Sequence, residues 1–162
     1  MNKKILFITS EFPPLPGGIG NHAYSLSNYL QKSGYNVSIL TDFRSEKEDI
    51  AFDKEQDFAI YRVKRNKLTQ FNRIKEAFTL AKKRQTIICS GKFPLWIGGI
   101  LKTFFFKKQF IAVLHGSEIR AGGNTSKHLT NWSLKKFDRI IAVSNFTKEI
   151  AIKHHPILKI EV

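Results

Sequence analysis

His115 is the residue of this 162-residue chain whose type and position most favour chemistry. It follows the apolar run Phe110–Leu114 and precedes Gly116, so it lies where a predicted strand gives way to a loop. An imidazole can both donate and accept a hydrogen bond near neutral pH. The position predicts a hydrogen bond to a bound ligand; the alternative is a hydrogen bond to a neighbouring loop carbonyl.

A glycine-rich loop provides a second candidate. Residues 18–23 read G-x-G-x-x-A, and Asp42 lies 22 residues beyond Gly20, which matches the dinucleotide fingerprint with its ribose-binding acid. In the dinucleotide fold, however, the first glycine follows the strand almost at once, whereas here residues 10–16 intervene and contain three stiff prolines. An NAD(P)-binding domain of an oxidoreductase is therefore the weaker alternative. The backbone N–H groups of a glycine loop at a helix start can still face a phosphate or a sugar.

The other reactive residue types form no familiar catalytic set. There is no convincing carboxylate pair, no Ser-His-Asp arrangement and no metal-ligand spacing, so neither a metal ion nor an organic cofactor is expected. His154 and His155 lack partners at ligand spacing and are expected at the surface. Cys89, the one cysteine, cannot form an internal disulfide and is expected to be a core thiol.

The hydrophobic pattern alternates between strands and helices along the whole chain. Predicted strands cover residues 4–9, 36–41, 58–63, 86–89, 110–114 and 139–143, with the start of another at 159–162. Helical spacing is found in residues 23–30, in Leu68–Ala81, in Phe93–Phe104 (Phe93, Trp96, Ile97, Ile100, Leu101, Phe104), in 126–136 and in 145–153, the last with Ser144 as its N-cap. The acidic segment 42–57 is expected to be a surface loop. This order predicts an α/β, Rossmann-like, doubly wound parallel sheet of about six or seven strands with helices on both faces.

Ligands of such sheets bind at the carboxyl ends of the strands, in the loops that lead into helices. The candidate loops are therefore residues 10–21, 90–92, 115–124 and 144–145.

Three stretches in this order resemble the N-terminal half of the GT-B retaining glycosyltransferases of family 4. The first runs from Ile5–Thr9 through Phe12-Pro13-Pro14 and Gly17-Gly18-Ile19-Gly20 to Leu30, Gly34, Val37 and Leu40-Thr41. The others are Val113–Glu118 and Asp138–Ser144, followed by Asn145-Phe146-Thr147. The resemblance covers residues 3–152, but segment 42–85 carries none of it.

The resemblance implies transfer of a sugar, with retention, from a nucleotide diphosphate-sugar to a glycan or lipid-linked acceptor, as in cell-envelope polysaccharide synthesis. Residues 1–162 would be the single acceptor-side domain. Gly17, Gly18, Ile19 and Gly20 would approach the donor, and His115 would bind a sugar hydroxyl as the catalytic residue. The leaving phosphate assists the incoming hydroxyl in this family, so no protein nucleophile is required. Residues expected to contact the acceptor are Asn21, His22, Lys92, Gly116, Ser117, Glu118 and Ser144; capping and turn roles remain alternatives for them.

The family's nucleotide-binding residues, a Lys/Arg clamp and a Glu-x7-Glu motif, belong to a second domain that nothing in this sequence matches. The isolated domain is therefore expected to be inactive without that C-terminal partner.

The charge is unevenly distributed. The net charge is +14, and residues 62–108 hold thirteen basic residues and one acid, whereas segment 42–57 has seven acids and three bases. This imbalance predicts an anionic partner. A basic polyanion-binding module is an alternative, but the usual nucleic-acid recognition motifs are missing, so nucleic acid is not expected. A cytoplasmic domain is expected, since no signal peptide or bilayer-spanning run is found.

Basic and aromatic residues together predict peripheral attachment to the inner face of the cytoplasmic membrane. The residues expected to face an anionic membrane are Lys82, Lys83, Arg84, Lys102, Phe105, Lys107 and Lys108.

Overall fold

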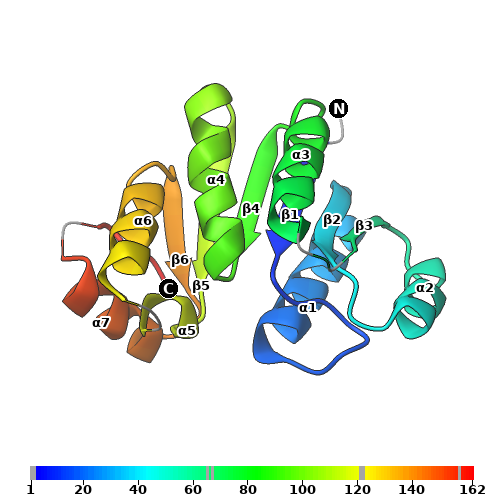
Figure 1. Cartoon of the computed structure of the whole chain (residues 1–162), viewed down its shortest axis with the longest axis horizontal. Coiled ribbons are helices and arrows are strands. Elements are labelled where there is room, and N and C mark those ends of the chain that lie inside the picture. Colours follow the sequence, from blue (N-terminus) through cyan, green and yellow to red (C-terminus); the bar gives the residue numbers. More distant parts are fainter. Residues whose placement is uncertain (1–2, 65, 67, 121–122, 157) are drawn as a thin grey trace.

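The computed structural model describes residues 3–64, 66, 68–120, 123–156 and 158–162, and it contains one parallel sheet of six strands (Figure 1). The strand order is β3-β2-β1-β4-β5-β6, with every neighbouring pair parallel. The strands are β1 (Lys4–Thr9), β2 (Asn36–Asp42), β3 (Ala59–Val63), β4 (Thr86–Ser90), β5 (Gln109–Leu114) and β6 (Arg139–Ala142). The helices are α1 (Gly18–Lys32), α2 (Glu46–Lys54), α3 (Thr69–Ala81), α4 (Lys92–Phe104), α5 (Ser117–Arg120), α6 (Asn124–Leu134) and α7 (Asn145–His154). The predicted Rossmann-like α/β fold is confirmed.

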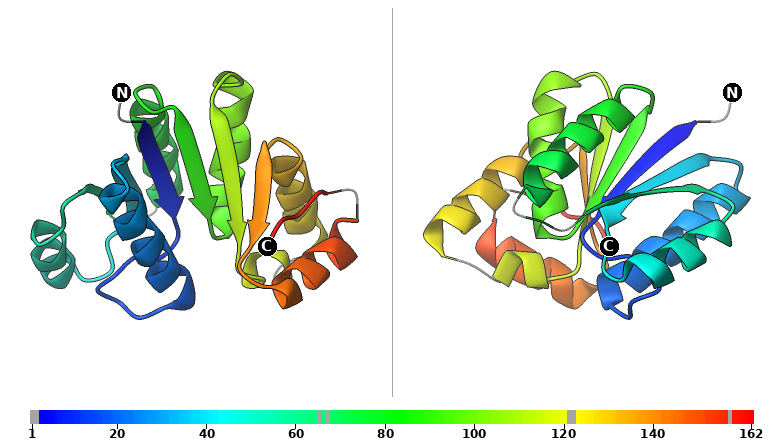
Figure 2. Two further views of the ribbon diagram at one scale, coloured as in Figure 1. Left: turned by 180° about the vertical axis from the view of Figure 1, so that it is seen from behind. Right: turned by 45° about the vertical axis from the view of Figure 1, so that its right-hand side comes forward.

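Helices cover both faces of the sheet. Alternate residues of β1 point to opposite faces, as strand geometry requires: Leu6 and Ile8 belong to one core, Ile5 and Phe7 to the other. The first core is closed by α3, α4 and α6, which stand together on one side of the sheet, and the second by α1 on the opposite side (Figure 2). Cys89 is fully buried in the first core, as predicted, and burial raises the pKa of its thiol.

Hydrogen bonds close two of the helix ends, and they confirm the predicted N-cap at Ser144. Gly34 and Tyr35 donate their backbone N–H groups to the carbonyls of Gln31 and Leu30, which closes the C-terminus of α1. The Ser144 hydroxyl accepts the N–H of Thr147 at 3.1 Å and caps α7.

The expectation of a loop over residues 42–57 is wrong, because residues 46–54 form α2. Three acids in its first turn stabilise the helix, because their negative charges lie at the positive end of the helix dipole. The carboxylate of Asp49 also accepts the N–H groups of Arg44 and Ser45, at 2.6 and 3.1 Å, and so fixes the turn that leads into the helix. The predicted strand at 159–162 is only a single parallel bridge between Glu161 and Ile141.

Helix α4 turns a different side to the core from the one its apolar spacing predicts. Its buried residues are Pro94, Leu95, Ile97, Gly98, Gly99 and Leu101. Gly99 lies against the backbone of α6, where a Cβ would stand 2.8 Å from the Cα of Ser133, so the two helices can approach closely. Of the predicted stripe, Ile97 and Leu101 point inward, whereas Phe93 and Phe104 are exposed by 39% and 65%.

Candidate active site

All strands end at the lower edge of the sheet in Figure 1, and the predicted ligand loops meet there. Gly91 and Gly116 make two of the sharp turns from strand to helix, with φ angles of 91° and 100° that favour glycine. At Gly91 a Cβ would also collide with the Ser10 side chain, since the loops after β1 and β4 pack directly on each other. The predicted edge is therefore one continuous rim.

His115 is held in this rim by two neighbours. Its Nε2 lies 2.9 Å from the hydroxyl of Ser90, the last residue of β4. Its ring stands edge-on to the ring of His22, from α1, with the ring centres 5.1 Å apart. Burial, and secondarily the charge of His22, lowers the pKa of His115 to about 4, and burial lowers the pKa of His22 as well. His115 is thus a neutral imidazole at physiological pH.

The lowered pKa of His115 predicts an acid-sensitive fold. Between pH 6.5 and about 4 the unfolded chain binds the proton more readily than the folded protein, so stability should fall as the pH drops through this window and level off below it. Urea denaturation at a series of pH values measures the effect, and the His115 ring signals in NMR should titrate with a midpoint near 4. In a His115→Gln variant the slope should be shallower; a midpoint near the ordinary histidine value would contradict the prediction.

The loop between β1 and α1, residues 10–17, forms an arm that is buried at Phe12 and exposed further along. Phe12 is buried and packs edge-on against the rings of Tyr24, Phe52 and Phe58, whereas Pro14, Leu15 and Pro16 are exposed. The arm therefore stays open to solvent at the rim and is fixed in place by its aromatic anchor.

The glycines of this arm and of the start of α1 serve different purposes. Gly20 lies against the backbone of Glu11 and Phe12, where a Cβ would be only 3.3 Å from three main-chain atoms, so it seats α1 on the arm. A side chain at Gly17 would meet the Glu11 carboxylate, and at Gly18 nothing lies within 4 Å. The N-terminus of α1 is thus open at Gly18, where backbone N–H groups can meet an anion.

Two adjoining cavities occupy the rim. One, of about 520 Å³, is lined by Glu11, Gly18, Ile19, His22, His115, Ser117 and Val143. The other, of about 400 Å³, is lined by Ser10, Glu11, Ile19, Asp42, Arg44, Gln70, Arg73, Lys92, Phe93, Ser117 and Glu118. Glu11, Ile19 and Ser117 belong to both, so the cavities form one site with two compartments.

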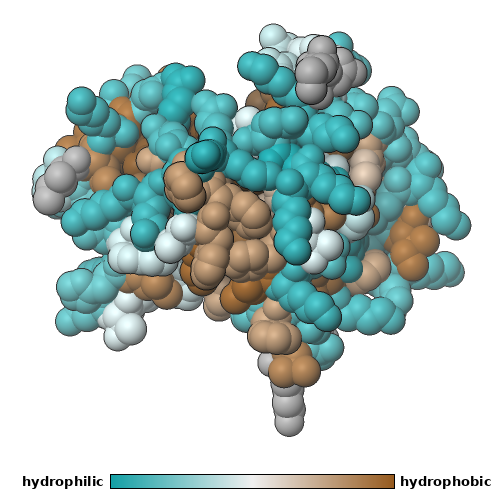
Figure 3. All heavy atoms as spheres, turned by 90° about the horizontal axis from the view of Figure 1, so that it is seen from above, coloured by the Kyte–Doolittle hydropathy of each residue, from teal (hydrophilic) through white to brown (hydrophobic). Residues whose placement is uncertain are grey.

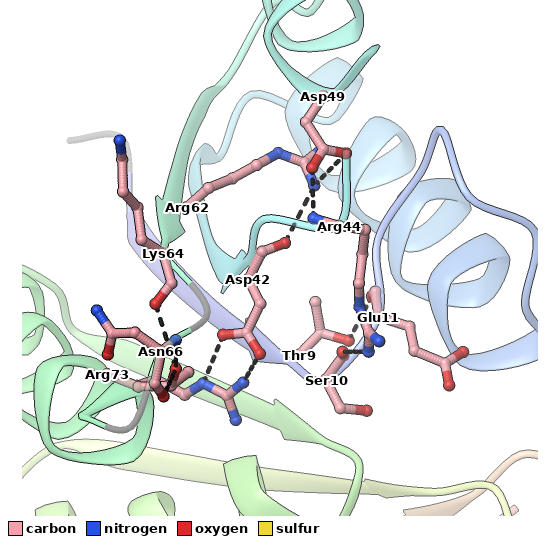
Figure 4. A network of polar contacts seen from close by, with 11 residues as sticks. Thr9, Ser10, Glu11, Asp42, Arg44, Asp49, Arg62, Lys64, Asn66 and Arg73 are labelled. Carbon is pink, nitrogen blue, oxygen red and sulfur yellow. Dashed lines mark hydrogen bonds and ion pairs between the residues drawn. The ribbon is translucent and has the colours of Figure 1, made fainter. Parts of the chain in front are cut away.

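Asp42 is not available to bind a ribose. It is 5% exposed and forms a bidentate ion pair with Arg73, whose Nε lies 3.0 Å from Oδ1 (Figure 4). The charge of this acid is thus neutralised by Arg73 of α3. This agrees with the interpretation from loop spacing that NAD(P) binding is the weaker alternative.

The predicted site residues separate into three groups. Gly18, Ile19, His22, His115 and Ser117 face the larger cavity, and Lys92 and Glu118 face the smaller one. The third group lines neither cavity: Gly17, Gly20, Asn21, Gly116 and Ser144.

Glu118 and Ser144 are occupied within the protein. Glu118 is 3% exposed; its carboxylate accepts the His115 N–H and lies 3.2 Å from the Ser117 hydroxyl, while burial raises its pKa. Ser144 is the cap of α7. The capping roles that the sequence analysis gave as alternatives to acceptor contact account for the contacts of both residues.

Several residues that line the cavities or contact His115 were not singled out from the sequence, among them Glu11, Arg44, Arg73 and Ser90, although Glu11 and Ser90 lie in the predicted candidate loops. The Glu11 carboxylate points away from the ion pairs around it (Figure 4) and lines both cavities. Its place directly after β1, at the ligand end of the sheet, is the signal that could have identified it. Within the described part of the chain, no group of three or more His, Cys, Asp or Glu side chains is placed to hold a metal ion.

The sequence profile of Glycosyltransferase Family 4 matches residues 16–162, so the chain belongs to this family and is a glycosyltransferase domain. No curated protein matches the sequence.

Several solved structures share the fold. Anabaena Alr3699/HepE in complex with UDP-glucose is 15% identical, with a TM-score of 0.70 over 97% of this chain and 43% of that protein. A glycosyltransferase from Rickettsia africae is 20% identical, with a TM-score of 0.70 over 98% of this chain and 42% of that protein. A UDP-N-acetylglucosamine 2-epimerase is 15% identical, with a TM-score of 0.64 and coverages of 98% and 46%. The chain therefore spans less than half the length of these proteins.

Proposed function

We propose that this chain is the acceptor-binding half of a retaining glycosyltransferase, which moves a sugar from a nucleotide diphosphate-sugar to a glycan or lipid-linked acceptor. The observation that carries the proposal is the larger cavity, because it brings the open N-terminus of α1 and the neutral ring of His115 to the same space. Family membership and the UDP-glucose bound to the Anabaena protein support a nucleotide-sugar as the donor.

The two sides of the larger cavity suit different parts of such a donor. Backbone N–H groups at Gly18 and Ile19 can face the diphosphate, and the dipole of α1 favours an anion there by about 0.3–1 kcal/mol. His115 can hydrogen-bond a sugar hydroxyl without adding a charge, because burial keeps its imidazole neutral at physiological pH. These contacts orient the sugar and leave its anomeric carbon open to the neighbouring compartment.

The smaller cavity is proposed as the place of the acceptor. It contains carboxylate, hydroxyl, amide and cationic side chains, which suit a hydroxyl-rich molecule. In the transfer, the acceptor oxygen bonds to the anomeric carbon, the bond from that carbon to the donor phosphate breaks, and the acceptor proton passes to the leaving phosphate. No side chain of this domain needs to become covalently attached.

A second, nucleotide-binding domain is required by this proposal, because the larger cavity is proposed to bind only the diphosphate and the sugar of the donor, and the nucleoside needs a site elsewhere. We therefore expect the chain alone to give no turnover with radiolabelled sugar nucleotides. Steady product formation by the isolated chain would contradict this expectation.

Donor binding can be tested on the chain itself by NMR. Titration with UDP-glucose at millimolar concentration should shift the amide signals of residues 17–20 and the ring signals of His115. NADH serves as the comparison: at equal concentration it should shift these signals less, and the signals around Asp42 should not move. If UDP-glucose leaves this region unchanged, or if NADH shifts it more strongly, the proposed donor site is wrong.

A further inference from the structure

The structure engages several of the residues predicted to face a membrane in contacts within the protein. The Lys108 amine donates hydrogen bonds to three carbonyls at the end of α3, those of Ala81, Lys82 and Arg84, and burial lowers its pKa. The Lys102 amine pairs with Asp138 at 2.7 Å. Both amines are engaged in contacts within the protein and are poorly placed to meet another surface.

Arg84 and Phe105 are also engaged inside the protein. Arg84 donates to the carbonyl of Leu80 and to the Ser38 hydroxyl, and Phe105 packs on the core. Lys82, Lys83 and Lys107 remain exposed. A membrane-binding surface therefore requires a region where exposed lysines lie beside exposed apolar side chains.

The outer side of α4 provides the exposed apolar side chains of such a surface. Phe93, Trp96, Ile100 and Phe104 recur at intervals of three, four and four residues, so they share one side of the helix. The residues buried in the core occupy the opposite side. Phe93 and Phe104 are well exposed, and Trp96 and Ile100 are half-buried. The helix thus presents an aromatic stripe to the outside along its whole length.

Neighbouring helices widen the stripe. On α3, the ring of Phe78 lies 5.2 Å from that of Phe104, and Phe71 is 66% exposed. On α6, Trp132 is 42% exposed, and the hydroxyl of Thr130 binds the indole nitrogen of Trp96 at 2.9 Å. Figure 3 views the end of the molecule where α3 and α4 finish; hydrophobic surface lies near its middle, with hydrophilic side chains around it. We call the exposed side of α3, α4 and α6 the aromatic face.

The charge beside the aromatic face is positive. Exposed lysines lie on or after its helices, namely Lys75, Lys82, Lys83, Lys107, Lys127 and Lys135. The Lys107 and Lys136 amines lie 5.9 and 4.9 Å from the ring centres of Phe106 and Trp132, at the border between charge and aromatic surface. Between residues 69 and 108 the sequence has a single acid, Glu76.

We propose that the aromatic face lies on an anionic lipid bilayer, with its rings at the headgroup level and its lysines against lipid phosphates. Aromatic rings with a basic border are the combination that favours interfacial binding to anionic lipids. A protein partner would need an acidic surface shaped to three helices, whereas a bilayer supplies negative charge over any such area. No helix in the described ranges is long and apolar enough to cross a membrane, so the contact is one of the surface.

The lower end of the aromatic face leads to the proposed acceptor compartment, since Phe93 and Lys92 line the smaller cavity. An acceptor whose lipid portion stays in the bilayer would reach the compartment past Phe93. This last step rests on the proposed function, whereas the attachment itself does not.

Both tryptophans of the chain, Trp96 and Trp132, belong to the aromatic face, so their fluorescence reports its contact directly. Vesicles of phosphatidylglycerol and phosphatidylcholine should sediment the chain, shift its emission to the blue, and quench it when the lipids carry bromine. Raising the salt concentration should release it. Lys82→Gln/Lys83→Gln should weaken binding about thirtyfold, since each lysine near an anionic surface contributes about 1 kcal/mol.

Phe93→Ser/Phe104→Ser should also weaken vesicle binding, by about tenfold or more. The matched control is Tyr29→Ser, an aromatic residue of α1 that is 70% exposed on the opposite side of the sheet, and it should bind as the unchanged chain does. Circular dichroism verifies that each variant folds. The proposal would be overturned if the Phe93→Ser/Phe104→Ser and Tyr29→Ser variants bound vesicles equally, or if the tryptophan emission did not change on vesicles. It would also be overturned if gel filtration showed a dimer whose tryptophan fluorescence was already that of buried side chains. UDP-glucose titration of the same variants tests the donor site separately.

Discussion

Replacing Arg62 with methionine should destabilise the fold by about 3–5 kcal/mol, a large fraction of the stability of a domain this size. The Arg62 side chain is 1% exposed, and its guanidinium lies 3.1 Å from Asp49 and 2.8 Å from Asp53, both on α2 (Figure 4 shows Arg62 and Asp49). Without Arg62, the fully buried carboxylate of Asp49 loses its countercharge. Urea denaturation followed by circular dichroism measures the change.

Two further variants show whether charge is the cause. Arg62→Met/Asp49→Asn removes the buried charge of Asp49 but keeps a side-chain oxygen that can accept the N–H groups of Arg44 and Ser45, so it should recover part of the lost stability. Lys64→Met breaks the ion pair between Lys64, whose side chain is 71% exposed, and Glu46, whose side chain is 59% exposed. It should change stability by less than about 0.5 kcal/mol. If Arg62→Met is as mild as Lys64→Met, the buried network does not stabilise the fold.

The same guanidinium also links α2 to the site. Its Nη2 donates to the carbonyl of Pro13 at 2.5 Å, in the arm that leads to Gly17 and α1. Loss of Arg62 should therefore weaken the UDP-glucose shifts at residues 17–20 even under conditions where the variant remains folded.

On the proposed function, replacing His115 with alanine should lower the transfer rate about tenfold to a hundredfold when the chain is assayed together with a nucleotide-binding domain. Loss of a hydrogen bond to a sugar hydroxyl costs about 1–3 kcal/mol when the partner is left unsatisfied, and 1.4 kcal/mol is a factor of ten. The measurement is kcat/KM with UDP-glucose as the trial donor. The fold should survive, because the ring lies at the rim and is half-buried.

His128→Ala is the matched control, since His128 is an exposed histidine of α6 that lines neither cavity. It should leave kcat/KM unchanged. Ser90→Ala removes the hydroxyl 2.9 Å from His115 and should give a smaller loss than His115→Ala, because the ring remains but is less well oriented. Equal activity of the His115→Ala and His128→Ala variants would show that His115 does not bind the sugar.

Sequence patterns predicted the framework well because they depend on local chemistry. A run such as Lys4–Thr9 has no polar face and must be buried on both sides, and the Ser144 cap lies next to the helix it closes. The alternation of strands and helices then predicts which edge of the sheet binds ligands, and it predicts that His115 lies at that edge.

What could not be predicted depends on partners far apart in the chain. Arg73 and Asp42 are separated by 31 residues, and nothing in either segment indicates their ion pair. Helix α4 is apolar on most sides, so its spacing did not decide which side faces the core. Its glycines decided it, because Gly99 allows α6 to approach and Gly98 lies against Cys89 and the ring of Phe137.

The single thiol of the chain is sealed in the first core, and burial raises its pKa, so it is a poor nucleophile at neutral pH. Maleimide reagents should therefore modify a cysteine introduced at the rim or on α4 while sparing Cys89. Spin labels or dyes can be attached at one chosen position without first removing the native cysteine, which makes distance measurements between the larger cavity and a vesicle surface directly accessible.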